Sequence, residues 1–175
     1  MQNAKIAYTR RKHFVTPIWR IKGHHYQSGV ELLELLIVLA IIGVVAFIAV
    51  PIYTSYRDKV NIATAVADIT TIEHSIEQYY QENNSYPDFL VDVKKASLLD
   101  PWKHPYQYLR IAGANLKGLG ALRKDKNRVP INTDYDLYSM GKDGMSVSPL
   151  TAKMSRDDIV RAYNGKFIGL AKDLI

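Results

Sequence analysis

The longest apolar stretch of the chain covers residues 35–56, which are 22 residues without a formal charge. About 20 apolar residues in a helix are enough to span a lipid bilayer. The charged residues Arg57, Asp58 and Lys59 follow directly and mark a return to water. The pattern therefore predicts one membrane-spanning helix near the N-terminus.

A second pattern continues from this stretch without a break. Apolar residues recur at steps of three and four, at Ile62, Val66, Ile69, Ile72, Ile76 and Tyr79. That spacing is typical of a helix with one apolar face. Asn83, Asn84 and Pro87 end it, because asparagine tolerates a left-handed cap and proline cannot continue a helix. Residues 30 to about 81 are thus predicted to form one helix, which contacts lipid in its first half and a protein core in its second.

The remainder is predicted to contain loops and short strands. Residues 87–100 form a linker with one turn around residues 91–97, residues 106–111 alternate as a strand does, and residues 167–171 form a last strand. Residues 112–133 are rich in glycine, lysine and arginine and are expected to be a solvated loop. A phosphate-cradling loop is the weaker alternative, because the chain lacks the Gly-x-x-x-x-Gly-Lys-Ser/Thr pattern.

The positive charge of the chain belongs to its N-terminal segment. The formal net charge is +6, yet residues 1–29 hold six basic residues and no acidic one, and the rest holds equal numbers of both. A nucleic-acid partner is therefore not expected, and the basic segment is expected to keep its end of the helix in the cytoplasm. His13, His24 and His25 are attributed to the composition of this segment rather than to metal binding. The chain has no cysteine, which excludes disulfides and thiolate metal sites.

Two acidic residues stand at the threshold of the apolar stretch. A charge near the bilayer interior costs roughly 2.5–3.5 kcal/mol on insertion scales, so such residues usually have a partner. Glu31 fits a charged flank outside the lipid. Glu34 fits that interpretation less well, since Leu32 and Leu33 already belong to the apolar segment. Glu34 is therefore a candidate functional residue.

The junction between the basic segment and the helix resembles a known processing signal. The stretch from Gly29 to Glu34, Gly-Val-Glu-Leu-Leu-Glu, resembles the class III signal peptide of type IV pilins and pseudopilins. The resemblance implies that a membrane peptidase cuts after Gly29 and methylates the new N-terminus at Val30. Pro51, the twenty-second residue counted from Val30, matches the helix-kinking proline of many members. A proline inside a helix lacks the N–H donor and clashes with the preceding turn.

Two further stretches resemble the G-type major pseudopilin of type II secretion. Asp-Pro-Trp-Lys-His-Pro-Tyr-Gln-Tyr at residues 100–108 is similar to the family signature Asp-Pro-Trp-Gly-x-Pro-Tyr-x-Tyr, with Lys103 in place of the usual glycine. Asp-Leu-Tyr-Ser-Met-Gly-Lys-Asp-Gly at residues 136–144 is similar to Asp-x-Tyr/Trp-Ser-x-Gly-x-Asp-Gly, a strand that runs into a turn.

The resemblance implies an α+β, pilin-like fold. A long N-terminal helix, membrane-spanning in its first half and amphipathic in its second, would pack on a small antiparallel sheet. The chain would divide into a cleaved leader at residues 1–29, a transmembrane and assembly helix at residues 30–56, and a soluble domain at residues 57–175. The helix would extend into the soluble domain to about residue 84.

The same resemblance implies a calcium site near the C-terminus. In the family, the Asp-Gly turn and a downstream Asp-Asp-Ile bind calcium, and Asp143, Asp157 and Asp158 stand here in that order. Calcium takes about six to eight oxygen ligands, which suits such residues. The 12 residues between the turn and Asp157 nevertheless form a longer loop than expected, and Val-Arg replaces the usual Asn-Trp after Asp-Asp-Ile. The alternative is a helix with Ser155 as N-cap and both aspartates in its first turn, ended by Gly165.

These features imply a structural subunit of a helical filament, the type II secretion pseudopilus, in the bacterial inner membrane. The N-terminus would be cytoplasmic and the C-terminal domain periplasmic. Its expected partners are further copies of itself, the prepilin peptidase, the inner-membrane assembly platform, and minor pilins or pseudopilins. A type IV pilus subunit is the first alternative, although such pilins often carry a disulfide loop that this chain cannot form. A membrane-tethered binding or sensor domain is the second.

An enzyme is not expected. The chain has neither a Gly-x-Ser-x-Gly nor a His-Glu-x-x-His motif, and the sequence around His74 and His104 offers no obvious nucleophile or metal-ligand cluster. Calcium is the sole cofactor that the resemblance implies.

Overall fold

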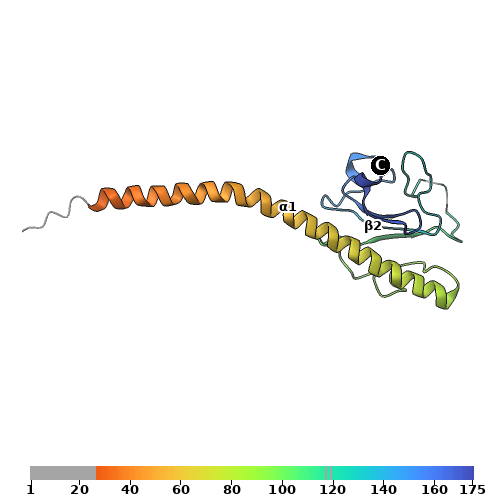
Figure 1. Ribbon diagram of the computed structural model, residues 1–175. Coiled ribbons are helices and arrows are strands. Elements are labelled where there is room, and N and C mark those ends of the chain that lie inside the picture. Colours follow the sequence, from red (N-terminus) through yellow and green to blue (C-terminus); the bar gives the residue numbers. More distant parts are fainter. Residues whose placement is uncertain (1–26, 117, 119) are drawn as a thin grey trace, which may run out of the picture. The chain divides into compact units, whose positions relative to one another are not determined.

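The computed structural model describes residues 27–116, 118 and 120–175 (Figure 1). Along the chain lie α1 (Gln27–Asn83), β1 (Gln107–Arg110), β2 (Tyr135–Ser139), η1 (Lys153–Ser155), β3 (Ile159–Ala162), β4 (Phe167–Leu170) and η2 (Ala171–Asp173), where η denotes a 3₁₀ turn. The chain divides into two compact units, one ending at Ile48 and the other covering Ala49–Ile175. The predicted long helix is confirmed and extends slightly at both ends.

The four strands form one antiparallel sheet in the order β1-β2-β3-β4. Each strand pairs with the next one in the chain: Gln107 lies opposite Tyr138, Tyr138 opposite Val160, and Val160 opposite Gly169. The predicted strands at residues 106–111 and 167–171 are therefore confirmed, as is the α+β, pilin-like fold.

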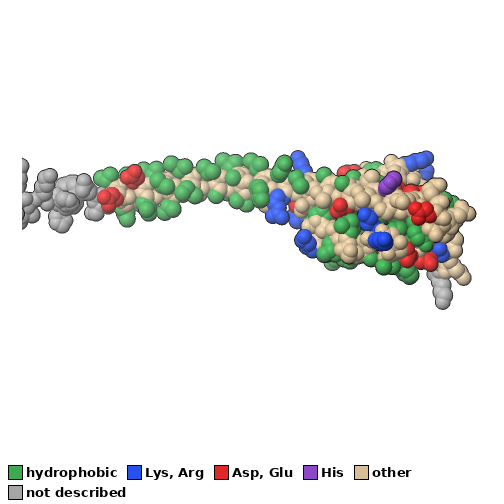
Figure 2. All heavy atoms as spheres, turned by 90° about the horizontal axis from the view of Figure 1, so that it is seen from below, with side chains coloured by type: hydrophobic (Ala, Val, Ile, Leu, Met, Phe, Trp, Pro, Cys, Tyr) green, Lys and Arg blue, Asp and Glu red, His purple; other side chains and the backbone are tan. Residues whose placement is uncertain are grey.

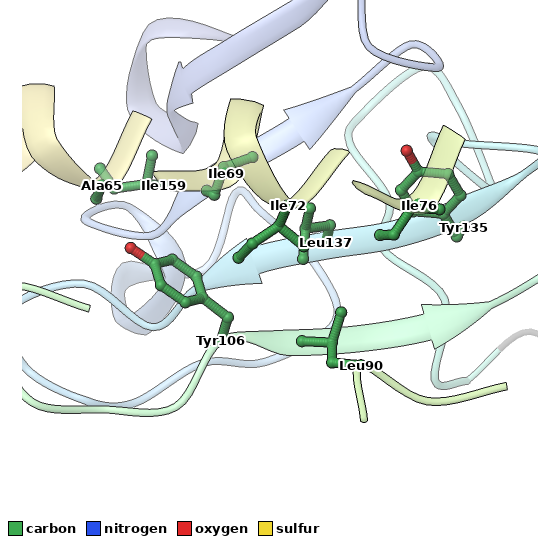
Figure 3. Close-up of a cluster of buried hydrophobic side chains, with 9 residues drawn as sticks. All are labelled: Ala65, Ile69, Ile72, Ile76, Leu90, Tyr106, Tyr135, Leu137 and Ile159. Atoms are coloured by element: carbon green, nitrogen blue, oxygen red, sulfur yellow. The ribbon is translucent and has the colours of Figure 1, made fainter. Parts of the chain in front are cut away.

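The main core lies between one face of α1 and one face of the sheet (Figure 3). Its buried residues are Ala65, Ile69, Ile72 and Ile76 from α1, Tyr135 and Leu137 from β2, Ile159 from β3, and Leu90 and Tyr106 from the segments before the sheet. Tyr135 and Leu137 are two positions apart, so their side chains leave the strand on the same side. The helical spacing of Ile69, Ile72 and Ile76 thus predicted the face of α1 that the sheet covers.

The opposite face of the sheet is covered by loops. A second buried cluster there consists of Ile131, Leu150, Val160, Ala162 and Ala171. The expectation that the whole of residues 112–133 is solvated is wrong, because Leu122 and Arg123 are buried along with Ile131. The backbone N–H of Arg123 donates to Asp136 Oδ2 at 2.9 Å, which ties the loop to β2.

The alternative of a helix capped by Ser155 is also wrong. Ser155 is buried in the single turn η1, where its hydroxyl donates to the carbonyl of Val147 at 2.8 Å and accepts the N–H of Val147 at 2.9 Å. The residues that follow pair with both neighbouring strands instead of continuing as a helix. Gly165, with a φ of +84°, lies in the turn between β3 and β4 rather than at a helix end.

Candidate functional site

The first half of α1 presents apolar side chains on all sides. Figure 2 shows them along its length, and their exposed fractions include 64% for Val30 and 83% for Phe47. An 18-residue window of this helix has a mean hydropathy of 3.2, and none of it is buried within the protein. By length and composition the helix can cross a membrane, and it is the one such helix in the described part of the chain.

Gly29 lies at the start of α1, next to the predicted cleavage point before Val30. Beyond the adjoining helix backbone, a Cβ atom added to Gly29 would meet no atom of the described residues within 4 Å, and the φ of Gly29 lies outside the left-handed region. Glycine inside a helix costs roughly 0.5–1 kcal/mol relative to alanine. The fold of the chain therefore gives no reason for glycine at this position. A requirement for glycine by the peptidase that is predicted to cut here would be one.

Glu34 is exposed on α1 among apolar neighbours. None of the ion pairs between residues 27–116, 118 and 120–175 includes it. Glu34 and Val30 are four positions apart and therefore lie on the same face of the helix. The partner expected for this carboxylate is thus not supplied by the described residues of its own chain.

Pro51 lies within α1, and the helix continues on both sides of it. Thr54 Oγ1 donates to the carbonyl oxygen of Pro51 at 2.9 Å. Because proline has no N–H, the carbonyl four residues earlier loses its usual donor. A kink at Pro51 stays a prediction.

The two stretches that resemble the G-type signatures meet in one hydrogen-bonded junction. Asp100 is buried and accepts the N–H groups of Trp102 and His104 at 3.0 and 2.8 Å. Ser139 donates its hydroxyl to the other oxygen of Asp100 at 2.5 Å. Lys103 has a φ of +77°, a left-handed conformation that glycine adopts more easily. The position where the signature has glycine is thus one where the backbone favours it.

The carboxyl groups of the three predicted calcium ligands accept hydrogen bonds from, or pair with, different groups. Asp157 Oδ2 accepts the N–H groups of Lys142 and Asp143 at 2.9 and 3.1 Å, and Asp143 Oδ1 accepts that of Met145 at 2.8 Å. Asp158 is completely buried, and its Oδ2 lies 3.4 Å from a guanidinium nitrogen of Arg123. Among the described residues, no group of three His, Cys, Asp or Glu side chains is arranged to hold a metal ion.

Asp158 has an unusual electrostatic environment. Burial raises the pKa of its carboxyl to about 7, while a hydrogen bond from the Ser146 hydroxyl and the positive charge of Arg123 act in the opposite direction. The other oxygen, Oδ1, is buried and has no hydrogen-bond partner in the described part of the protein. Calcium takes about six to eight oxygens gathered around one point, and the described aspartates do not form such a group. The residues as arranged therefore do not fit a calcium ion.

Comparisons with known proteins show to which protein family this chain belongs. No family model and no solved structure matches it. The type II secretion system core protein G of Aeromonas hydrophila is 33% identical over 139 residues, which cover 67% of this chain and 85% of that protein. The protein of the same name from Escherichia coli K12 is 32% identical over 125 residues, which cover 67% and 83%. The chain belongs to the type II secretion system core protein G family. The relative from Pseudomonas aeruginosa is 28% identical over 139 residues, with coverage of 67% and 85%.

Membership of the core protein G family confirms the resemblance found in the sequence, down to the G-type subunit. The cleavage site at Gly29 and Val30 and the assembly role of Glu34 stay predictions, because these depend on other proteins. No calcium site is supported for this member of the family, in spite of the matching order of Asp143, Asp157 and Asp158.

One buried cluster of charges in this protein is not predicted from the sequence. Arg161 is buried between α1 and the sheet, where its guanidinium binds Glu73 Oε1 at 2.6 Å and Asp134 Oδ2 at 2.7 Å. It also lies 4.0 Å from the centre of the Tyr135 ring. Burial by itself lowers the pKa of Arg161, but the hydrogen bonds to Asp134 and Glu73, together with the charge interactions with Tyr135 and Asp134, more than offset this and raise it. The one signal in the sequence was the Val-Arg pair after Asp-Asp-Ile, which departs from the family pattern.

Proposed function

We propose that the protein is a subunit of the type II secretion pseudopilus, a helical filament assembled from the bacterial inner membrane that supports protein secretion. The uncovered apolar half of α1 carries the proposal, since none of its most apolar window is buried within the protein. A continuous apolar surface of this kind needs lipid or other helices around it. Family membership favours helices of further copies, because the relatives are core proteins of a secretion system.

The small residues of α1 support close packing of such copies. Beyond the adjoining helix backbone, a Cβ added at Gly43 would meet no atom of the described residues within 4 Å. Ala40, Ala46 and Ala49 lie on either side of it along the helix. Small residues allow helix backbones to approach closely in a membrane, where van der Waals packing drives association.

Glu34 has a specific role in this proposal. Cleavage after Gly29 leaves a cationic amine on Val30, which stays cationic when it is methylated. Glu34 of a neighbouring subunit neutralises that amine inside the bundle of helices. A buried charge without a partner is costly, whereas the matched pair offsets this cost and fixes the register between subunits.

The proposed topology follows from the charge distribution. Residues 1–29 are a leader that the prepilin peptidase removes, residues 30–56 span the inner membrane once, and residues 57–175 form the periplasmic domain. The basic leader keeps the N-terminus in the cytoplasm. The partners are further copies, the assembly platform of the inner membrane, and minor pseudopilins.

The names of the relatives favour the secretion pseudopilus over the type IV pilus and the tethered sensor. A structural role rather than an enzymatic one also follows from membership of this family. Deleting the gene in its own bacterium tests the proposal. We expect the proteins that the secretion system exports to remain in the periplasm, and a plasmid copy to restore their export. Unchanged export in the deletion strain would contradict the proposed function.

Replacing Gly29 by alanine is expected to block cleavage, so that the leader stays attached. The wild-type protein extracted from membranes should begin at Val30 and carry one N-methyl group, and intact-mass spectrometry measures both. Gly43→Ala is the matched control, because it makes the same change in the same helix, and the added Cβ of either glycine has open space among the described residues beyond the adjoining helix backbone. An intact leader on the wild-type protein, in cells with active prepilin peptidase, would show that the assigned cleavage site is wrong.

A further inference from the structure

The guanidinium of Arg123 is surrounded by oxygen atoms of the segment that follows β2. Its guanidinium donates to the carbonyl oxygen of Val147 and to the hydroxyl of Ser146, and it lies 3.4 Å from Asp158 Oδ2. The exposed fraction of the side chain is 5% for Arg123 and 0% for Asp158. Ser146 in turn donates its hydroxyl to Asp158. A carboxylate, a hydroxyl and a backbone carbonyl thus converge on one buried positive charge.

Arg123 is held in this place from two further directions. Its guanidinium lies 3.5 Å from the centre of the Tyr138 ring, a distance at which a cation and an aromatic face attract each other. Its backbone N–H donates to Asp136 Oδ2 and its backbone carbonyl accepts the N–H of Ile131, each at 2.9 Å. The charge is therefore fixed by β2 and by its own loop, and not by Asp158 alone.

The oxygen types around Arg123 are those that a calcium ion takes from a protein loop. We infer that Arg123 is a built-in cation, which in this protein holds the segment of residues 145–158 against the sheet in place of a bound calcium ion. The loop of 12 residues between the Asp-Gly turn and Asp157 supplies two of the three oxygens, from Ser146 and Val147. The longer loop therefore supplies oxygen atoms that the guanidinium of Arg123 binds.

The arrangement excludes a divalent ion at the same carboxylate. Like charges a few ångström apart repel strongly in a site shielded from water. A calcium ion on Asp158 would lie beside the guanidinium of Arg123, which has no room to leave because it is buried under Tyr138. The oxygens of Asp143 and Asp157 that accept backbone N–H groups are already used to shape the turn.

The test is thermal unfolding of the full-length protein in detergent, in millimolar calcium and in a calcium chelator. We expect the two Tm values to agree, and calorimetric titration with calcium chloride to show no saturable binding. A Tm that rises in calcium by about 4 °C or more, or a saturable binding heat, would overturn the inference. This measurement needs no variant and does not depend on filament assembly.

A charge-removal variant tests the pairing itself. Arg123→Gln should lower the Tm in calcium and chelator alike, because it leaves the buried Asp158 carboxylate without its counter-charge. Adding Asp158→Asn to that variant should recover part of the loss. Lys126→Gln is the matched control, since Lys126 lies in the same loop and is exposed. An Arg123→Gln protein as stable as the control, or a double variant less stable than Arg123→Gln, would contradict the proposed role.

Discussion

Replacing Glu34 by leucine is expected to leave membrane insertion intact and to reduce the filament yield by about tenfold or more. The change removes an insertion penalty of roughly 2.5–3.5 kcal/mol, so the anchor itself should improve. Assembly should suffer, because the amine of a neighbouring Val30 then enters the helix bundle without a counter-charge. Shearing overproduced filaments from cells and comparing the sheared and membrane fractions by immunoblot measures both effects.

Glu31→Leu is the matched control for this experiment. Glu31 lies in the same first turns of α1, is exposed as Glu34 is, and is interpreted as a flank outside the lipid. Its replacement should change the filament yield much less. Equal yields from wild-type and Glu34→Leu cells would remove the assembly role of Glu34 and would favour a helix that serves only as an anchor.

Replacing Arg161 by methionine is expected to lower the free energy of unfolding by about 3–5 kcal/mol. Methionine keeps the apolar stem but removes the charge, and the carboxylates of Glu73 and Asp134 then lose a partner at 2.6 and 2.7 Å. Both carboxylates lie largely out of water, with exposed fractions of 20% and 12%. Denaturant unfolding of the full-length protein in detergent, followed by circular dichroism, measures the loss.

Arg110→Met is the control for burial. Arg110 also pairs with an aspartate, Asp88, at 3.1 Å, but the exposed fraction of Asp88 is 64%. An exposed pair of this kind contributes about 0–1 kcal/mol. If the two variants unfolded at the same denaturant concentration, the buried position of Arg161 would not explain its contribution.

The features that the sequence predicted well are those set by neighbours along the chain. The spacing of Ile69, Ile72 and Ile76 indicates a buried helix face, whichever part of the chain covers it. The structure confirms this face. The turn that begins at Asp100 is local in the same sense, because its hydrogen bonds join Asp100 to residues two and four positions away.

The features that it did not predict depend on residues far apart in the chain. Arg123 lies in a loop rich in charged residues, and nothing in its neighbourhood indicates that Ser146 and Asp158 will enclose it. Ser155 has a residue pattern typical of a helix N-cap, but the pairing of β3 with two strands outweighs that local preference. For the metal site, the order of the three aspartates matched the family, whereas the cation that neutralises Asp158 came from another segment.

The order of the sheet has a consequence for how the protein matures. Each strand pairs with the next along the chain, so strand pairing closes only short or moderate loops and carries a modest entropic cost. The helix differs, because the covering partners of Ile69 and Ile72 are strands that follow much later. During synthesis, the apolar stripe of α1 therefore emerges first and stays uncovered until β2 and β3 have been made. A nascent chain in that interval is exposed to aggregation.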